Sequence, residues 1–444
     1  NVTYSVNPVI PGNSTVVTLN GMAALAPGTY PVTITGTAGT EIKTVTLTYI
    51  VSPGSGPAIS GQPAVQTVCA GSNASFSIIS ASATSFQWQV STAGAGGPWT
   101  NISNGGVYSN ATTATLNITG ALANMNSYQY RCVASVICGS TNSSPALLTV
   151  NTAPAISVQS ANTTVCAGQT AVFSVTATGS GLGYQWQIST TGCTGTWTNL
   201  SNTAPYSGVT TANLSINPAT AAMNAYVYRC VVSGTCAPAV NSNCAILTVN
   251  SPITITSKPS ASTLCAGGQT TFTVGASGSN PTYQWQESTD NGASWNNINN
   301  GGVYSGAATS VLTLTNVTAV MSGNQYRAVV TGTAVCGIPI NSGAGLLTVN
   351  TAPAITTQPV ASTTLCAGNN TTYTVVANGT ALTYQWQLST TGAGGPWTDI
   401  SNTGVYSGSA TASLTITGVV VGMDTYQYRA VVSGTCTPPA ISNA

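Results

Sequence analysis

The chain has 444 residues, of which 6 are Lys or Arg, 5 are Asp or Glu and none is His, so 2% of it is charged and its formal net charge is +1. Soluble proteins average about 25% charged residues, so hydroxyl and amide side chains must cover this surface. Such a chain has no long-range field to attract nucleic acid or an anionic membrane, and its weak self-repulsion favours assembly into a fibre or a surface layer.

The missing histidines exclude several kinds of catalytic and metal site. There is no Ser–His or Cys–His pair and no imidazole metal ligand in the sequence. The five carboxylates, Glu41, Glu287, Asp290, Asp399 and Asp424, form no repeated cluster, whereas calcium takes about six to eight oxygen ligands. We therefore expect a protein that is not an enzyme and that uses no cofactor and no metal.

The cysteines and the apolar segments indicate the compartment. No apolar run is long enough to span a bilayer, so we expect no membrane insertion. Twelve cysteines in a chain of short polar strands favour an oxidising, extracellular or cell-surface location. The chain begins at Asn1 rather than Met, which is typical of a mature product or of a window cut from a longer chain.

The first 53 residues differ in pattern from the rest of the chain. Their second half, TYPVTITGTAGTEIKTVTLTYIV, reads as two β-strands joined by a turn. We predict that residues 1–53 form the last strands of a separate, partial β-sandwich.

From residue 54 onward, the chain repeats with a period of about 100 residues. In each repeat, a QWQ motif is followed by a second Trp, a Tyr-Ser pair and a Tyr-Arg pair. The period matches one two-sheet sandwich of about seven strands. We therefore expect an all-β chain of tandem immunoglobulin-like β-sandwiches stacked end to end, with repeats at residues 54–151, 152–250, 251–350 and 351–444.

Alternation of polar and apolar residues locates strands within a repeat. In repeat 4 it predicts strand B at TTYTVVA, C at TYQWQLS, C′ at WTDIS, E at ASLTITG and F at YQYRAVVS. Repeats 1 to 3 end in a strand G, LLTVN or ILTVN, whereas repeat 4 stops after ISNA. The sheet edge that strand G would cover in repeat 4 is therefore unpaired. Either the sequence is cut before strand G, or a strand from a neighbouring molecule completes the sheet.

The order VCAG, YQWQ, GPWT, GVYSG, LTITG, YQYR and VVSGTC resembles the immunoglobulin-like repeats of large secreted and cell-surface proteins of Bacteroidota. The resemblance covers about residues 54–444. It implies the same fold and the roles of such proteins, which are adhesins, gliding-associated surface proteins or non-catalytic tails of secreted enzymes, commonly exported by the type IX system. The sorting domain of that export class is absent from this sequence, and function transfers between such relatives less well than fold.

Aromatic and Arg side chains are predicted on both faces of the sheet that holds strands C and F. A Trp on strand C packs in the core of such sandwiches, and these are Trp88, Trp186, Trp285 and Trp386. The next Trp and the Arg of strand F face outward, as the pairs Trp99 and Arg131, Trp197 and Arg229, Trp295 and Arg327, and Trp397 and Arg429. Each pair is either a cation–π clasp of the domain's own surface or a face for sugar binding or lateral packing.

Two cysteines occupy fixed places in every repeat. Those before the A–B corner are Cys69, Cys166, Cys265 and Cys366, and those at the F–G turn are Cys138, Cys236, Cys336 and Cys436. In a sandwich of this topology the two places lie at opposite ends, roughly 20 Å apart, whereas a disulfide tolerates Cα atoms up to about 7 Å apart.

End-to-end stacking offers each A–B cysteine a partner in the next repeat. We predict the interdomain disulfides Cys69–Cys236, Cys166–Cys336 and Cys265–Cys436, with pairing inside each repeat as the alternative. Cys138 and Cys366 would then bond to neighbours outside this sequence.

Four cysteines lie outside this pattern. Cys132 and Cys230 point into the core with no cysteine opposite them on strand B, so we predict buried free thiols. Cys193 and Cys244 occur only in repeat 2, and we expect them to be exposed at its opposite ends, where a crosslink to another molecule is an option.

Three functions fit these patterns. The first is a structural extracellular protein that forms a rigid rod or filament for adhesion or as a surface appendage, and that contacts itself end to end, laterally or by strand donation. The second is a carbohydrate- or receptor-binding module that uses the Arg–Trp face. The third is a spacer within a long secreted enzyme.

Overall fold

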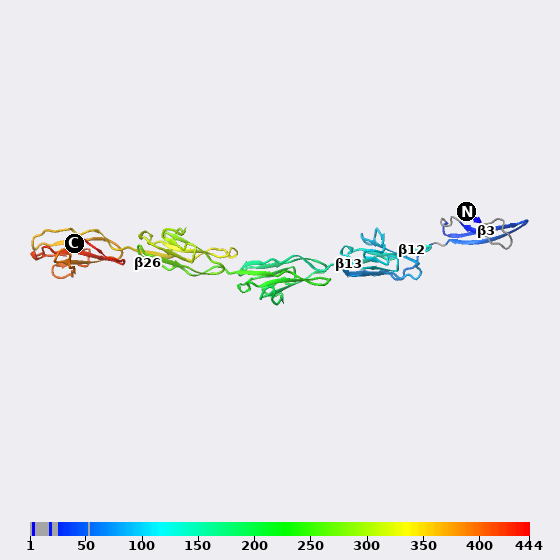
Figure 1. The fold of residues 1–444 in the computed structure, drawn as a ribbon, viewed down its shortest axis with the longest axis horizontal. Coiled ribbons are helices and arrows are strands. Elements are labelled where there is room, and N and C mark those ends of the chain that lie inside the picture. Colours follow the sequence, from blue (N-terminus) through cyan, green and yellow to red (C-terminus); the bar gives the residue numbers. More distant parts are fainter. Residues whose placement is uncertain (1, 5–16, 20–24, 52–53) are drawn as a thin grey trace. The chain divides into compact units, whose positions relative to one another are not determined.

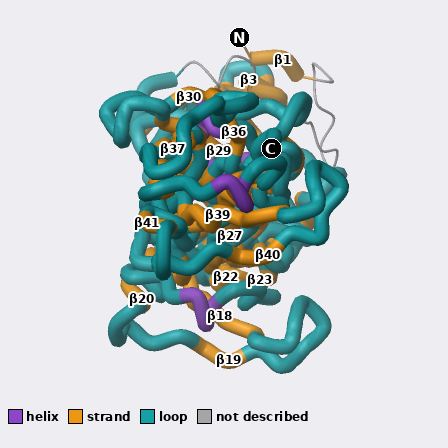
Figure 2. The backbone as a smooth tube through the Cα atoms, turned by 90° about the vertical axis from the view of Figure 1, so that its left-hand side faces the viewer, coloured by secondary structure: helices purple, strands orange, loops and turns teal. Residues whose placement is uncertain are grey.

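The computed structural model in Figure 1 describes residues 2–4, 17–19, 25–51 and 54–444. The fold is all-β, as predicted, and Figure 2 shows the described helical residues as short segments among strands and loops. These segments are single turns of 3-10 helix: η2 (Ala123–Met125), η3 (Ala221–Met223), η4 (Ala319–Met321), η5 (Ala334–Cys336) and η6 (Val421–Met423).

The N-terminal segment contains a long β-hairpin. Strands β3 (Gly28–Ala38) and β4 (Glu41–Val51) pair antiparallel along their whole length. Gly39 in the two-residue turn has φ +62°, a conformation that favours glycine at the first position of a type II′ hairpin turn. Strands β1 (Val2–Tyr4) and β2 (Val17–Leu19) also pair. The rest of the sandwich predicted over residues 1–53 lies outside the described residues.

The chain forms two compact units, one of residues 1–161, 173–214 and 227–245 and one of residues 162–172, 215–226 and 246–444. Repeat 1 lies in the first unit, repeats 3 and 4 lie in the second, and repeat 2 contributes to both.

Repeat 1 is a sandwich of two sheets. Its strands are β5 (Gln66–Cys69), β6 (Ala74–Ser77), β7 (Ser85–Ser91), β8 (Thr100–Asn101), β9 (Tyr108–Ser109), β10 (Thr115–Ile118), β11 (Gln129–Val136), β12 (Gly139–Asn142) and β13 (Ala146–Asn151). One sheet has the order β6-β10-β9, and the other has the order β5-β13-β11-β7-β8 with β12 paired to β11. The first strand of the larger sheet, β5, runs parallel to the last strand, β13.

Repeat 2 contains the same series of strands and, in addition, a separate pair of short strands, β14 and β17. The strands of repeat 2 are β14 (Ala155–Val158), β15 (Thr163–Cys166), β16 (Ala171–Ser174), β17 (Thr176–Thr178), β18 (Gly183–Ser189), β19 (Thr198–Asn199), β20 (Tyr206–Ser207), β21 (Asn213–Ile216), β22 (Val227–Ser233), β23 (Val240–Asn241) and β24 (Ala245–Asn250).

Repeat 3 has sheets of order β27-β32-β31 and β26-β35-β33-β29-β30, with β34 paired to β33 and a separate pair β25-β28. Its strands are β25 (Thr254–Ser257), β26 (Ser262–Cys265), β27 (Thr270–Thr273), β28 (Gly275–Ser277), β29 (Thr282–Ser288), β30 (Asn296–Asn297), β31 (Tyr304–Ser305), β32 (Val311–Leu314), β33 (Gln325–Thr331), β34 (Ile340–Asn341) and β35 (Gly345–Asn350).

Repeat 4 has a shorter second sheet, of order β40-β39-β43-β44. Its strands are β36 (Ala354–Thr357), β37 (Thr371–Thr374), β38 (Val376–Asn378), β39 (Thr383–Ser389), β40 (Thr398–Asp399), β41 (Tyr406–Ser407), β42 (Ser413–Ile416), β43 (Gln427–Ser433) and β44 (Ala440–Ile441). Residues 363–366, which correspond to β5 and β26, are not in a strand. In repeats 1 and 3 that strand pairs with strand G, for which repeat 4 has no counterpart among its described residues.

Strand B of repeat 4 differs from its predicted form. The sequence predicts one strand at TTYTVVA, but the structure has two, because β37 pairs with β42 while β38 pairs with β36. At the break, the backbone N–H of Val375 donates to the carbonyl of Ala412. The strand therefore changes its pairing partner near Val375, from β42 before this residue to β36 after it.

The predicted core tryptophans lie at the centre of the sandwiches. Trp88, Trp186, Trp285 and Trp386 are all 0% exposed. In repeat 1, Trp88 belongs to the same buried cluster as Phe76 and Tyr130. Tyr130 stacks on Phe76 with ring centroids 4.8 Å apart, so three aromatic side chains join the two sheets.

Candidate functional site

Three disulfides join consecutive repeats. They are Cys69–Cys236, Cys166–Cys336 and Cys265–Cys436, with Cα–Cα distances of 5.8, 5.3 and 5.8 Å. These are the same pairs that the sequence predicts. The first cysteine of each pair is the last residue of β5, β15 or β26, and the second follows strand F of the next repeat.

The register of the sheets explains why a cysteine at this corner can reach the next repeat. Cys69 pairs with Asn151, and Cys265 pairs with Asn350, each of which is the last residue of a strand G. The cysteine therefore lies beside the point where the chain leaves one repeat for the next. In the second unit, the Cys336 sulfur lies 3.4 Å from the carbonyl oxygen of Asn250, at the end of β24.

The linkers are also hydrogen-bonded to the repeat that follows them. The backbone N–H of Thr152 donates to the Ser180 hydroxyl at 3.0 Å, and the Ser180 N–H donates to the Thr152 carbonyl at 3.0 Å. Ser251 and Ser279, and Thr351 and Thr380, form the same reciprocal pairs. These contacts were not predicted, although a Ser or Thr recurs at both positions in the sequence.

Four cysteines are free. Cys132 and Cys230 are buried, with 0% of each side chain exposed, whereas Cys138 and Cys366 are exposed. Burial raises the pKa of the Cys132 and Cys230 thiols to about 11. These two thiols are therefore protonated at neutral pH, and a protonated thiol is a poor nucleophile.

The expectation for Cys193 and Cys244 is wrong. They do not lie exposed at opposite ends of repeat 2 but form a disulfide with each other, with Cα atoms 5.8 Å apart. The loop between β18 and β19 folds back over the outer face of the sheet, where the Trp197 ring lies 4.4 Å from the Arg229 guanidinium. This fold carries Cys193 across the face to Cys244, which immediately precedes β24.

An Arg lies over a Trp ring on the outer face of every repeat. The Arg Cζ atom is 4.1 to 4.4 Å from the ring centroid in the pairs Arg131 and Trp99, Arg229 and Trp197, Arg327 and Trp295, and Arg429 and Trp397. In repeat 1, the Arg131 Nε–H also donates to Gln89 Oε1 at 2.8 Å, and Gln89 Nε2 donates to Asn101 Oδ1 at 2.8 Å.

The other glutamine of the QWQ motif is bound internally. Gln87 Nε2 donates to the carbonyls of Trp88 and Ile102 at 2.9 and 2.8 Å. Gln185, Gln284 and Gln385 make the same two contacts in the other repeats. The polar groups of this face are thus largely paired with one another, which leaves few of them for a ligand.

Within the described parts of the chain, no helix has the length and apolarity to cross a bilayer. The same residues contain no group of three or more Cys, Asp or Glu side chains arranged to hold a metal ion.

Glu287 is a carboxylate for which the sequence predicted no role. It lies opposite Tyr326, at the position that Val90, Ile188 and Leu388 hold in the other repeats.

The two-sheet sandwiches, each with a buried Trp on strand C, define a tandem array of immunoglobulin-like domains. The chain belongs to the family described as a domain of unknown function (DUF8696), whose model matches residues 59–152, 156–251 and 254–351. No curated protein matches the chain.

Solved structures of immunoglobulin arrays are similar to the chain at low identity. An I-band fragment of titin, I67–I69, is 18% identical with a TM-score of 0.44, and the match covers 66% of this chain and 99% of the fragment. Sidekick-1 immunoglobulin domains 1–5 are 16% identical with a TM-score of 0.37, and the match covers 96% of this chain and 87% of that one. The N-terminal four immunoglobulin domains of Dscam1 are 15% identical with a TM-score of 0.30, and the match covers 86% and 96%.

The free thiols predict a labelling pattern. In the native, monomeric protein, iodoacetamide should modify Cys138 and Cys366 at about pH 7.5, because both side chains are exposed and free in the single chain. Cys132 and Cys230 should react only after unfolding in guanidinium chloride, because they are buried and protonated. Peptide mass spectrometry measures both steps, and native labelling of Cys132 would contradict the buried assignment.

The Arg–Trp pairs predict a local stability effect. Trp397→Ala should destabilise repeat 4 by at least the ~0.5–2 kcal/mol of the cation–π contact with Arg429. Hydrogen exchange of the β39 and β43 amides measures this loss, with Val421→Ala as a control because Val421 is 81% exposed. Unchanged exchange in Trp397→Ala would argue against a structural clasp.

Proposed function

We propose that this chain is a non-catalytic, structural extracellular protein whose tandem sandwiches form a rigid rod or filament that resists tension. The observation that carries the proposal is the overlap of the disulfides between repeats. An oxidising extracellular location is supported by the disulfides themselves, because such bonds persist outside the cytosol. The resemblance of the repeats to Bacteroidota surface proteins supports a role in adhesion or in a surface appendage.

The disulfides between repeats close three overlapping loops of chain. Cys69–Cys236 encloses residues 69–236, Cys166–Cys336 encloses residues 166–336, and Cys265–Cys436 encloses residues 265–436. Each loop begins before the preceding one has ended. No repeat can therefore be pulled out of the chain without breaking a covalent bond.

The overlap shortens the covalent path through the protein. The shortest path between the termini follows residues 1–69, 236–265 and 436–444 and crosses two disulfides. This path contains 108 residues and extends to about 360 Å, whereas the fully reduced chain extends to about 1,500 Å. Even with every repeat unfolded, the oxidised protein stays within about a quarter of the length of the open chain.

The unpaired cysteines support contact of the chain with further immunoglobulin-like repeats. Cys366 is of the A–B type and Cys138 is of the F–G type, and in the three disulfides between repeats these two types always bond to each other. A Cys366–Cys138 bond between two copies would repeat the same linkage end to end.

Repeat 4 has a groove that fits a strand G, whether the strand comes from chain beyond residue 444 or from a neighbouring molecule. A cavity of about 580 Å³ is lined by Leu365, Tyr373, Met423 and Tyr428. Tyr373 is half-buried, whereas Phe272 at the same position of repeat 3 is 1% exposed. Gln427 Oε1 in the cavity wall is buried without a hydrogen-bond partner in the described structure. A strand with the pattern of β35 would cover these groups and pair with β43.

The other two functions are less well supported. A sugar-binding role for the Arg–Trp face is disfavoured because Arg, Gln and Asn side chains on it bond to one another. A spacer within a long secreted enzyme would have the same mechanical properties as a structural rod. The two roles differ only in the domains that adjoin the repeats.

Single-molecule force spectroscopy tests the mechanical proposal on the full chain. Pulled by its termini, the oxidised protein should reach a contour length of about 360 Å, and the reduced protein should reach about 1,500 Å. The variant Cys69→Ser/Cys236→Ser should extend to about 750 Å, because its shortest path then crosses Cys193–Cys244 and Cys265–Cys436.

The matched control removes a disulfide that is not on the shortest path. Cys166→Ser/Cys336→Ser should leave the contour length of the oxidised protein unchanged, although it removes the same number of bonds. An oxidised wild type that extends as far as the reduced chain would refute the proposal.

A synthetic peptide tests strand acceptance. The peptide GAGLLTVN, residues 343–350, should slow hydrogen exchange of the Tyr428 amide and of residues 363–366 in the full chain, since it would supply the partner that β35 provides in repeat 3. A scrambled peptide of the same composition is the control. Equal effects of the two peptides would count against strand donation.

A further inference from the structure

Repeat 3 places a carboxylate where the other repeats place an aliphatic side chain. Glu287 lies on β29 opposite Tyr326, and the residues opposite the equivalent tyrosines are Val90, Ile188 and Leu388. Two residues before that tyrosine, repeat 3 has Asn324, whereas the other repeats have Tyr128, Tyr226 and Tyr426. Repeat 3 therefore exchanges an apolar pair for a carboxylate and a smaller amide at one location.

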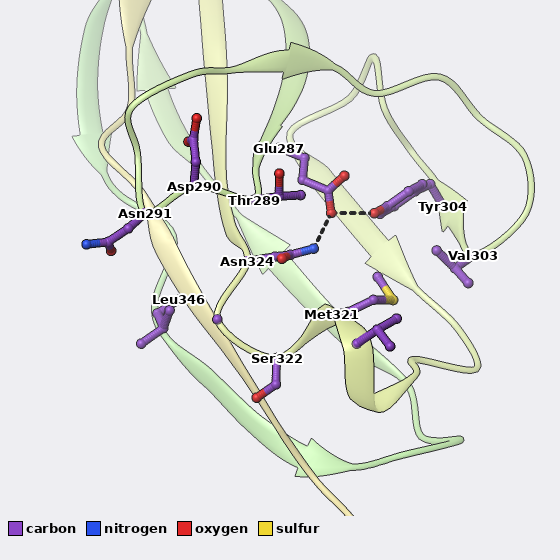
Figure 3. A pocket seen from close by; sticks show the side chains of 12 residues that line it. Glu287, Thr289, Asp290, Asn291, Val303, Tyr304, Met321, Ser322, Asn324 and Leu346 are labelled. Atoms are coloured by element: carbon purple, nitrogen blue, oxygen red, sulfur yellow. Dashed lines mark hydrogen bonds between the residues drawn. The ribbon is translucent and has the colours of Figure 1, made fainter.

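One oxygen of the Glu287 carboxylate is fully engaged. Its Oε1 accepts hydrogen bonds from Tyr304 Oη at 2.7 Å, from Tyr326 Oη at 2.8 Å and from Asn324 Nδ2 at 2.7 Å. Figure 3 shows Tyr304 and Asn324 converging on this oxygen. Burial raises the pKa of Tyr304 to about 12, so its hydroxyl remains a donor at neutral pH. These three donors hold the carboxylate in one orientation.

The second oxygen of Glu287 is available. Among the residues that the structure describes, none donates a hydrogen bond to Oε2, and this atom is not among the buried polar atoms that lack partners. Asn324 Oδ1 likewise accepts no hydrogen bond from a described residue, whereas Asn324 Nδ2 donates to Glu287.

Glu287 and Asn324 both line a hollow of about 780 Å³ (Figure 3). Leu346, Val320 and Met321 provide apolar surface in the same lining. The hollow is largely open to solvent and has room for a short alkylamine. It thus combines hydrogen-bond acceptors with apolar surface.

The hollow is negatively charged. Asp290 lines it with Glu287, and its lining contains no Lys or Arg. Hydrogen bonds from the Ser294 hydroxyl and N–H, together with one from Ser288, lower the pKa of Asp290 to about 2. Asp290 is therefore ionised at neutral pH, and it adds negative charge beside Glu287.

We propose that this hollow of repeat 3 binds a primary ammonium group carried on a short apolar stem, the chemistry of a lysine side chain or of a free alkylamine. The ammonium group donates to Glu287 Oε2, and the stem packs on the apolar part of the same lining. The negative charge disfavours an anionic ligand. Glu287, Asp290 and the Asn324 amide supply too few oxygens for calcium, which takes about six to eight oxygen ligands. This site is independent of the mechanical function proposed above.

Nuclear magnetic resonance titration of the 15N-labelled full chain tests the proposal. The probes are n-butylammonium chloride and Nα-acetyl-lysine methylamide, with 1-pentanol and Nα-acetyl-norleucine methylamide as neutral counterparts. Both amines should shift the Gly323 backbone amide and the Asn324 side-chain amide in a saturable manner, and the neutral compounds should not. Tighter binding of the lysine derivative would identify a protein side chain as the source, and equal binding would identify a free amine.

Two variants separate the site from the fold. Glu287→Gln keeps the shape of the side chain but removes its charge, so amine affinity should fall by about tenfold or more. Asn324→Tyr restores the residue of the other three repeats, which already fold around a tyrosine at this position, and should abolish binding by filling the hollow. Asp424→Asn, in the corresponding turn of repeat 4, is the matched control and should bind as the wild type does.

The proposal would be overturned if neither amine shifts these amides, or if the neutral compounds shift them equally. It would also be overturned if Glu287→Gln and Asn324→Tyr bind the amines with wild-type affinity.

Discussion

Each sandwich depends on how the strand C tryptophan is held between its two sheets. In repeat 1, the Trp88 N–H donates to the Ala111 carbonyl at 2.8 Å, its indole Nε1–H donates to the Thr113 carbonyl at 2.9 Å, and its carbonyl accepts from the Ile102 N–H at 2.9 Å. The same contacts recur around Trp186, Trp285 and Trp386. A buried indole needs a partner for its N–H, so these bonds fix the register of strand C against the loops that cross it. Once that register is set, alternation along the strand fixes which side chains face outward.

The outer face then compensates for the scarcity of charge. With only 11 charged residues in 444, the chain has few salt bridges to use. Each repeat instead places its Arg against a Trp ring and a Gln on the outer face of strands C and F. Continuity between repeats is covalent and polar, through the disulfides and the paired Ser and Thr residues of the linkers. Neither device requires net charge, so both fit a surface with little self-repulsion.

Features that follow from periodicity or strand direction were predictable. The burial of Trp88 and the outward direction of Arg131 follow from alternation, and the pairing of Cys69 with Cys236 follows from the opposite ends at which strands A and F finish. Loop paths were not predictable in this way. The Cys193–Cys244 bond depends on a loop that folds over the sheet, and no local pattern encodes that path. The division of strand B in repeat 4 depends on a change of partner strand. The Glu287 and Asn324 pair is visible in the sequence as two departures from the repeat, but their contact is not.

The sequence by itself determined the number of sandwiches, the strands that carry their cores and the side of each strand that is buried, because a repeated motif and a period of two residues express these directly. Only the tertiary structure decided where loops cross a face, which polar groups satisfy one another and where a cavity remains. The physical reason is that these features arise from contacts between segments distant in the chain, such as Glu287 with Asn324 or Cys193 with Cys244. Such contacts depend on the packing of whole sheets, which the local order of residues does not specify.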